Sequence, residues 1–101
     1  MHALDALGNP VRRKILLALR AGPLPLHDIA SRFPVSRPAV SRHVRLLEEA
    51  GLVEAEQRGR ESVYSVRLKG FSSVREFIDT FWDTALDRLA ELAKHDVETK
   101  L

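Results

Sequence analysis

The sequence has 101 residues, of which 45% are apolar and 30% are charged, a composition typical of one small folded domain and not of a disordered chain. It contains no cysteine, which excludes disulfides, thiolate metal sites and thiol redox switches. The formal net charge is +2, but residues 1–70 carry a net charge of +5 and residues 71–101 a net charge of −3, so we expect anion binding from the first part only.

Two further features bear on where the protein works. No apolar run approaches the roughly 20 residues of a membrane span, and the N-terminus lacks the basic-then-apolar pattern of a signal peptide. We therefore expect a cytoplasmic protein with no membrane partner, built as a single domain over residues 1–101. A chain this short favours a binding module over an enzyme.

Helical patterns fill the first third of the chain. Residues 1–8 form a short apolar-patterned segment that can dock elsewhere. Asn9-Pro10 is a cap followed by a first helical position, which predicts a helix from about Pro10 to Arg20 with basic residues interleaved. Residues 24–33 have apolar side chains at i, i+3, i+4 and i+7, which predicts another short helix that ends before Pro34.

Residues 36–51 read as one helix with a marked start and end. Ser36 is a good N-cap, Pro38 suits the first turn, and Gly51 can adopt the left-handed conformation past the end. Apolar spacing predicts a buried face formed by Ala39, Val40, His43, Val44, Leu46 and Leu47. The opposite face is cationic and hydroxylated, which suits insertion into a DNA groove; the predicted DNA-binding residues of this helix are Ser36, Arg37, Pro38, Ser41, Arg42 and Arg45.

The next segment completes a recognisable arrangement. Two short helices joined by a tight turn over residues 24–51 form a helix-turn-helix. Residues 52–69 then alternate with period two around Arg58-Gly59-Arg60, which predicts a β-hairpin wing whose Arg58 and Arg60 reach DNA phosphates or the minor groove. The predicted fold is mainly α with a β-hairpin, a winged helix-turn-helix with the order α-α-α-α-β-β-α.

The C-terminal third predicts one long amphipathic helix. Ser73 and Glu76 have the spacing of a capping box, and apolar residues then recur at helical spacing over about 25 residues. A domain this small does not need so long an apolar stripe, so we assign residues 1–8 and 72–98 to a two-fold homodimer interface. Its predicted residues are Leu4, Leu7, Phe77, Phe81, Trp82, Ala85, Leu89 and Leu92.

Other interpretations compete with DNA binding. The basic helix face could be an ordinary solvated surface, and a winged helix can serve as a protein-interaction module, although that role favours acidic or apolar groups where this chain has arginines. His43 falls on the apolar side of its helix and is expected to be a packed structural residue. Ser41 and His43 are two positions apart and do not face each other, and no phosphate loop is present, so no enzyme activity is expected.

The chain resembles the ArsR/SmtB-type winged-helix transcriptional repressors over nearly its full length. The matching stretches are Ala6–Leu16, Val35–Val44, Leu47–Val53, the Arg58–Arg60 wing and Tyr64. The resemblance implies a cytoplasmic homodimer that binds double-stranded DNA at an inverted-repeat operator and represses transcription. It also implies that the first and last helices build the dimer interface.

The chain departs from the metal-sensing members of this family. The segment around Leu24–Asp28 has no cysteine pair. His95-Asp96-Val97-Glu98 matches the second half of a C-terminal zinc motif, but the first half falls near Trp82-Asp83-Thr84, which has no histidine. Zinc needs about four ligands, so we expect no metal and no cofactor, as in the cysteine-free branch. A metal-responsive repressor with a C-terminal histidine site remains the alternative.

Overall fold

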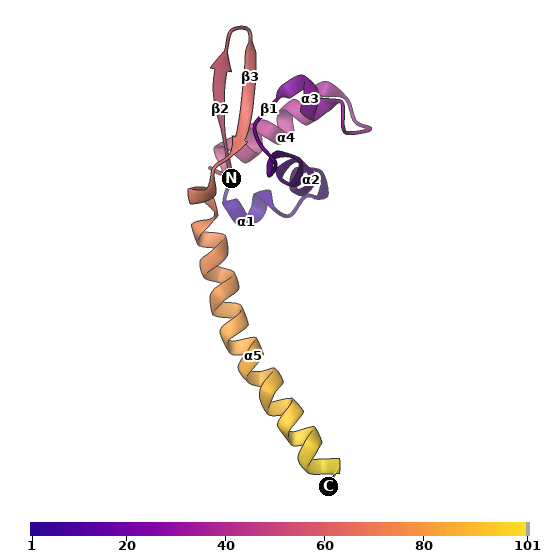
Figure 1. Ribbon diagram of the computed structural model, residues 1–101, viewed down its shortest axis with the longest axis vertical. Helices are drawn as coiled ribbons and strands as arrows, with labels where there is room; N and C mark the ends of the chain where they lie inside the picture. The colour runs from indigo at the N-terminus through magenta and orange to yellow at the C-terminus, as the bar shows by residue number, and fades with distance from the viewer. Residues whose placement is uncertain (101) are drawn as a thin grey trace.

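The computed structural model describes the backbone of residues 1–100 and the side chains of residues 1–95. In chain order the elements are α1 (Ala3–Ala6), α2 (Pro10–Leu19), β1 (Leu24–Pro25), α3 (Leu26–Ala30), α4 (Arg37–Glu49), β2 (Val53–Arg58), β3 (Glu61–Val66), the 3-10 turn η1 (Leu68–Phe71) and α5 (Ser72–Lys100). The first eight form a head, from which α5 extends as a stalk (Figure 1). The winged helix-turn-helix prediction is confirmed, with one short strand added.

The core lies where α2 and α4 contact each other and the β2–β3 hairpin. Ile15, Val40, Val44, Leu47 and Leu52 are fully buried. Each side chain of this size contributes about 1.5–3 kcal/mol when it is removed from water. The apolar spacing of the sequence therefore fixes which face of α4 points inward, and the opposite face is left to solvent.

The two predicted N-caps, Asn9 of α2 and Ser36 of α4, are confirmed. The Asn9 side chain accepts hydrogen bonds from the backbone amides of Val11 (2.8 Å) and Arg12 (3.2 Å). The Ser36 hydroxyl accepts one from the Ala39 amide (3.3 Å), which fixes the direction in which α4 begins.

The helix expected over residues 24–33 is shorter than predicted. Leu24 and Pro25 form strand β1, and α3 spans only Leu26–Ala30. The reason is local, because a residue before proline is disfavoured in helical conformation and is pushed towards extended backbone. Leu24 lies opposite Tyr64 and Pro25 opposite Val63, so β1 ties the start of the helix-turn-helix to the wing.

The wing is the outer part of a three-stranded antiparallel sheet with the order β1-β3-β2. Strands β2 and β3 pair from Val53 with Val66 to Arg58 with Glu61. Gly59 has φ +62° and, in the described chain, no residue other than glycine has positive φ. A two-residue hairpin turn with positive φ only at its first position is of type II′, which requires glycine there.

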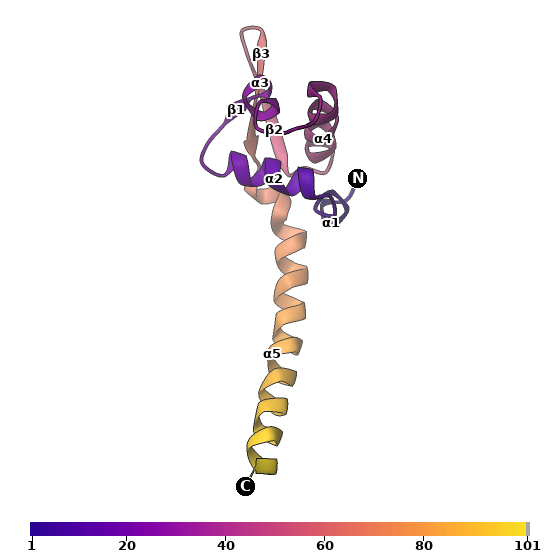
Figure 2. The same ribbon diagram turned by 90° about the vertical axis from the view of Figure 1, so that its right-hand side faces the viewer.

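Helix α5 begins at Ser72, directly after η1, so the predicted capping box at Ser73 is wrong: Ser73 already lies inside the helix. Val74 is the buried residue that anchors α5 to the head. Gly70 permits this junction, because a Cβ there would overlap the Gly51 carbonyl. Beyond Val74 the helix leaves the head, and the molecule measures 69 × 27 × 23 Å (Figure 2). Within the described residues no helix is long and apolar enough to cross a membrane.

Candidate DNA-binding surface

Helix α4 presents a cationic outer face. Arg37, Arg42 and Arg45 are exposed, while the opposite side of the helix is buried in the core. Pro38 is exposed in the first turn, and Ser36 is exposed with its hydroxyl engaged in capping. Ser41 was expected on this outer face but is half-buried, because it lies at the boundary between the two faces. The three arginines are therefore the groups best placed to reach a polyanion.

His43 has the structural role expected of it. Its Nδ1 lies 3.3 Å from an Nη atom of Arg12, which is itself buried. Burial lowers the pKa of the His43 imidazole below its usual value of 6.5, and the guanidiniums of Arg12 and Arg42 lower that pKa further. A guanidinium can only donate, so the neutral ring accepts at Nδ1 and carries its proton on Nε2.

Arg12 joins three helices through one side chain. Its Nε donates to the Ala6 carbonyl (2.8 Å) and an Nη donates weakly to the Asp5 carbonyl (3.5 Å), both in the last turn of α1. Its other Nη contacts His43 in α4. Arg12 thus gives the Ala6 carbonyl, at the end of α1, a hydrogen-bond donor and links it to the candidate DNA-reading helix.

Not all of the positive charge of residues 1–70 is available for anions, which corrects the expectation drawn from the charge count. Besides Arg12, Arg13 donates to the Leu7 carbonyl (2.7 Å) and Arg67 to the Gly51 carbonyl (3.3 Å). These cations bind the backbone of the head. Of the remaining exposed arginines in residues 1–70, five lie on α4 and the wing tip, while Arg20 and Arg32 lie elsewhere in the head.

The two wing arginines differ from each other. An Nη atom of Arg58 lies 3.1 Å from a carboxylate oxygen of Glu56, two residues earlier in the same strand. Arg60 lies in the turn itself and lines a pocket at the inner side of the wing. Arg58 is therefore partly neutralised where it stands, and Arg60 is the better placed of the two to meet an external anion.

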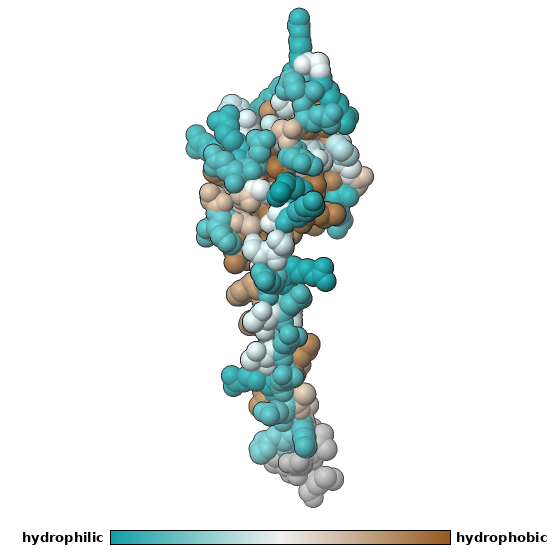
Figure 3. Space-filling view, turned by 90° about the vertical axis from the view of Figure 1, so that its left-hand side faces the viewer, coloured by the Kyte–Doolittle hydropathy of each residue, from teal (hydrophilic) through white to brown (hydrophobic). Residues whose placement is uncertain are grey.

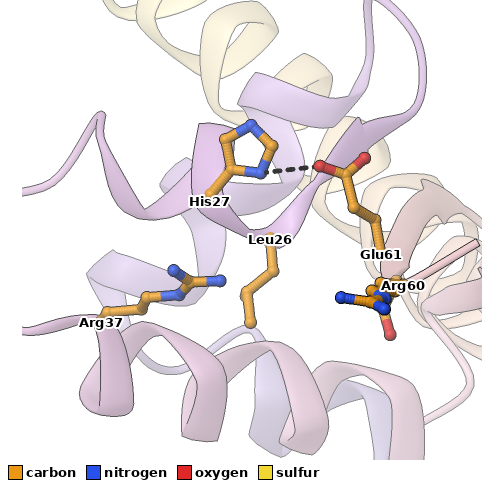
Figure 4. A pocket seen from close by; sticks show the side chains of 6 residues that line it. Leu26, His27, Arg37, Arg60 and Glu61 are labelled. Carbon is orange, nitrogen blue, oxygen red and sulfur yellow. Dashed lines mark ion pairs between the residues drawn. The ribbon is translucent and has the colours of Figure 1, made fainter.

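That pocket lies between α3, the first turn of α4 and the wing tip, and has a volume of about 310 Å³. It is lined by Leu26, His27, Arg37, Arg60, Glu61 and Ser62. Arg37 and Arg60 approach from different elements, and Glu61 lies on the His27 side (Figure 4). The Nδ1 atom of His27 is 3.4 Å from a Glu61 carboxylate oxygen, and its Nε2 atom is 3.3 Å from Asp28. Neither His27 nor Glu61 is among the DNA-binding residues predicted from the sequence.

The predicted interface residues on α5 are exposed in the single chain. Phe77, Phe81, Trp82, Leu89 and Leu92 are 50–61% exposed. Apolar side chains are visible along the stalk (Figure 3). The Phe77 and Phe81 rings stack with centroids 6.3 Å apart, and Trp82 meets Phe81 edge-on at 5.7 Å.

The other predicted interface residues are covered to different degrees. Ala85 is half-buried, and Leu4 is 40% exposed. Leu7 is half-buried because it packs against the core of its own head, so less of it is open to a partner than was expected.

Only part of the C-terminal histidine motif lies among the residues whose side chains the structure describes. Among residues whose side chains are described, no three His, Cys, Asp or Glu lie close enough to hold a metal ion. Asp96 and Glu98, which belong to the motif with His95, lie outside these residues.

The head, the exposed cationic helix and the basic wing define a DNA-binding protein of the winged helix-turn-helix class. A family model described as a helix-turn-helix domain matches residues 7–56. The chain is 40% identical over 91 residues to the HTH-type transcriptional regulator Rv2034 of Mycobacterium tuberculosis, covering 90% of this chain and 85% of that protein.

Solved structures of transcriptional regulators have the same fold as this chain. A possible transcriptional regulator for arsenical resistance superposes with a TM-score of 0.78 at 36% identity, covering 90% of this chain and 95% of the other. The homodimeric winged helix-turn-helix domain of Mb0332 from Mycobacterium bovis, a possible ArsR-family regulator, superposes with a TM-score of 0.63 at 25% identity over 78% of this chain and 73% of that one. The chain belongs to the ArsR/SmtB family of DNA-binding transcriptional regulators, which are not enzymes.

Proposed function

We propose that the protein is a cytoplasmic homodimeric repressor that binds an inverted-repeat operator. The observation that carries the dimer is the exposed apolar stripe of α5, where Phe77, Phe81 and Trp82 each have half or more of their surface open. A contiguous apolar patch of this kind is uncommon on soluble monomers and marks an interaction site. A two-fold interface covers it with the same surface of a second chain.

The cationic face of α4 supplies the reading function. An exposed guanidinium on a helix in the major groove can donate two hydrogen bonds to guanine, and Arg42 lies in the middle of that face. Arg37 at the start of the helix and Arg45 one turn beyond Ser41 extend the contact. A bound dimer on a promoter blocks access of the polymerase, which is the basis for proposing repression.

Symmetry then defines the operator. Two α4 helices related by a two-fold axis and about 34 Å apart meet successive major grooves on one face of the duplex. One helix alone makes too few contacts for specific affinity, so operator binding should depend on the dimer.

A pair of charge insertions on α5 tests this proposal. Phe81→Glu places a carboxylate in the stripe, whereas Ala90→Glu places the same group about two and a half turns further along, on the opposite side of the helix. Phe81→Glu should sediment as a monomer and lose operator binding while the far-UV circular dichroism of the head persists. Ala90→Glu should remain a dimer that binds. Equal behaviour of the two variants would contradict the assignment of the stripe to the interface.

A further inference from the structure

Two cations from different elements, Arg37 and Arg60, line the pocket between α3, α4 and the wing. Arg37 belongs to the first turn of α4 and Arg60 to the wing turn, yet both side chains line one cavity (Figure 4). Among the described residues neither guanidinium has an ion-pair partner within 4.0 Å. Two like charges facing one cavity repel each other, and an anion bound between them removes that repulsion.

The dimensions and position of the pocket favour a phosphate group. A volume of about 310 Å³ is roughly ten times the share of one water molecule in the liquid, so a phosphate fits with its hydration. The pocket opens beside the start of α4, where amides add positive potential. A guanidinium matches phosphate oxygens with parallel hydrogen bonds, and two guanidiniums from different elements can hold one phosphate from two sides.

Glu61 is the internal competitor for these cations. Its carboxylate follows Arg60 directly in the chain and lines the same pocket. In the structure it is turned to His27 at 3.4 Å, towards α3 (Figure 4), and among the described residues no ion pair joins it to Arg37 or Arg60. The other nitrogen of His27 is occupied by Asp28, which does not line the pocket.

We propose that this pocket seats a backbone phosphate of the bound DNA between Arg37 and Arg60, and that His27 is a positioning residue that keeps Glu61 from neutralising them. The inference rests on the proposed DNA-binding function and adds His27 and Glu61 to it. Because the His27 pair is half-exposed, its effect is modest: a pair of this kind corresponds to an affinity change of about two- to fivefold.

Four variants test the inference through duplex affinity, measured by fluorescence anisotropy at constant salt. His27→Ala should weaken binding about two- to fivefold, since the freed Glu61 then pairs with the arginines. Glu61→Gln should bind more tightly than the wild type, and His27→Ala/Glu61→Gln should bind as Glu61→Gln does. The matched control His27→Ala/Asp28→Asn removes the other carboxylate and should remain as weak as His27→Ala.

The effects should be equal on operator and random duplex, because a phosphate contact carries no sequence information. Arg37→Ala/Arg60→Ala should lower the slope of log affinity against log salt by about one unit for each pocket that loses a phosphate. The inference is overturned if His27→Ala binds as the wild type does, or if adding Glu61→Gln to it restores nothing.

Free phosphate is the other source of the same chemistry. Inorganic phosphate should compete for the pocket in either case, so the salt slope of duplex binding decides between the two sources. A slope that falls in Arg37→Ala/Arg60→Ala assigns the pocket to a DNA phosphate, whereas a slope equal to that of the wild type assigns it to a free phosphorylated ligand and overturns the DNA assignment. If the wild type binds no duplex at all, the proposed function fails; if it binds and the four variants are indistinguishable, only this inference fails.

Discussion

Replacing Arg12 by methionine should destabilise the head far more than the same replacement one residue later. Arg12→Met keeps the apolar stem of the side chain but removes the guanidinium that joins α1 to α4. Arg13→Met is the matched control, because the Arg13 guanidinium also donates to a carbonyl of the same region, at 2.7 Å, but from an exposed position.

The loss of unfolding free energy can be estimated from the contacts that the Arg12 guanidinium makes. The Arg12 bond to Ala6 at 2.8 Å is charge-assisted and buried, which corresponds to about 1.5–3 kcal/mol. The contact with neutral His43 at 3.3 Å adds about 0.5–1 kcal/mol, and the 3.5 Å contact with Asp5 adds little. We expect Arg12→Met to lower the free energy of unfolding by about 2–4 kcal/mol and Arg13→Met by less than about 1 kcal/mol.

Urea denaturation followed by circular dichroism measures both changes. All samples must have the same protein concentration, because the stability of an associating protein depends on it. Equal small losses for the two variants would show that the buried guanidinium does not hold α1 to α4.

The contact between Arg12 and His43 should make the stability of the head depend on pH. Burial and the neighbouring arginines lower the pKa of His43 in the folded chain below 6.5, so between that lowered pKa and pH 6.5 the unfolded chain binds more protons than the folded one. The stability supplied by neutral His43 is therefore present above about pH 6.5 and is lost as the pH falls through this window. In His43→Gln the urea midpoint of unfolding should change less between pH 7 and pH 5 than it does in the wild type. A pH dependence equal to that of the wild type would show that His43 does not contribute to it.

Three further predictions concern DNA and metals. Arg42→Ala should weaken operator binding by about 1–3 kcal/mol and reduce discrimination between bases, whereas equal weakening on random duplex would assign Arg42 to phosphate contact. Arg58→Ala/Arg60→Ala should lower affinity for all sequences and reduce the salt slope by about 1–2 units, with Arg60→Ala accounting for most of the change because Arg58 is paired with Glu56. Zinc, cadmium and arsenite should not release the protein from DNA in a mobility-shift assay; release by micromolar zinc that is lost in His95→Ala would contradict this.

Local sequence signals predicted most of the fold. The caps at Asn9 and Ser36 and the inward face of α4 were readable because they depend on residues within one or two turns. The strand at Leu24 was missed although Pro25 signals it, because the apolar spacing of residues 24–33 also fits a helix and the pairing with β3 is formed by residues about 40 positions later. The start of α5 at Ser72 depends on the η1 turn, and no residue pattern marked that turn beforehand.

Long-range contacts account for what the sequence could not provide at the candidate site. Arg12 had a usable signal, since Arg12, Ile15, Leu16 and Leu19 share one helical face and all are buried. A cation in that register is expected to bind internal carbonyls and not DNA. His27 and Glu61 had no such signal, because their approach depends on the position of the wing against α3.

The stoichiometry of the complex with DNA distinguishes a dimeric repressor of an inverted repeat from a protein that binds DNA as a monomer. Sedimentation of the protein with an inverted-repeat duplex and with a duplex that carries a single half-site measures how many chains bind and how tightly. A dimeric repressor should bind the inverted repeat as two chains together, should be a dimer in free solution at micromolar concentration, and should bind the half-site much more weakly. A wild-type monomer that binds the single half-site as tightly as the inverted repeat would contradict the dimeric repressor.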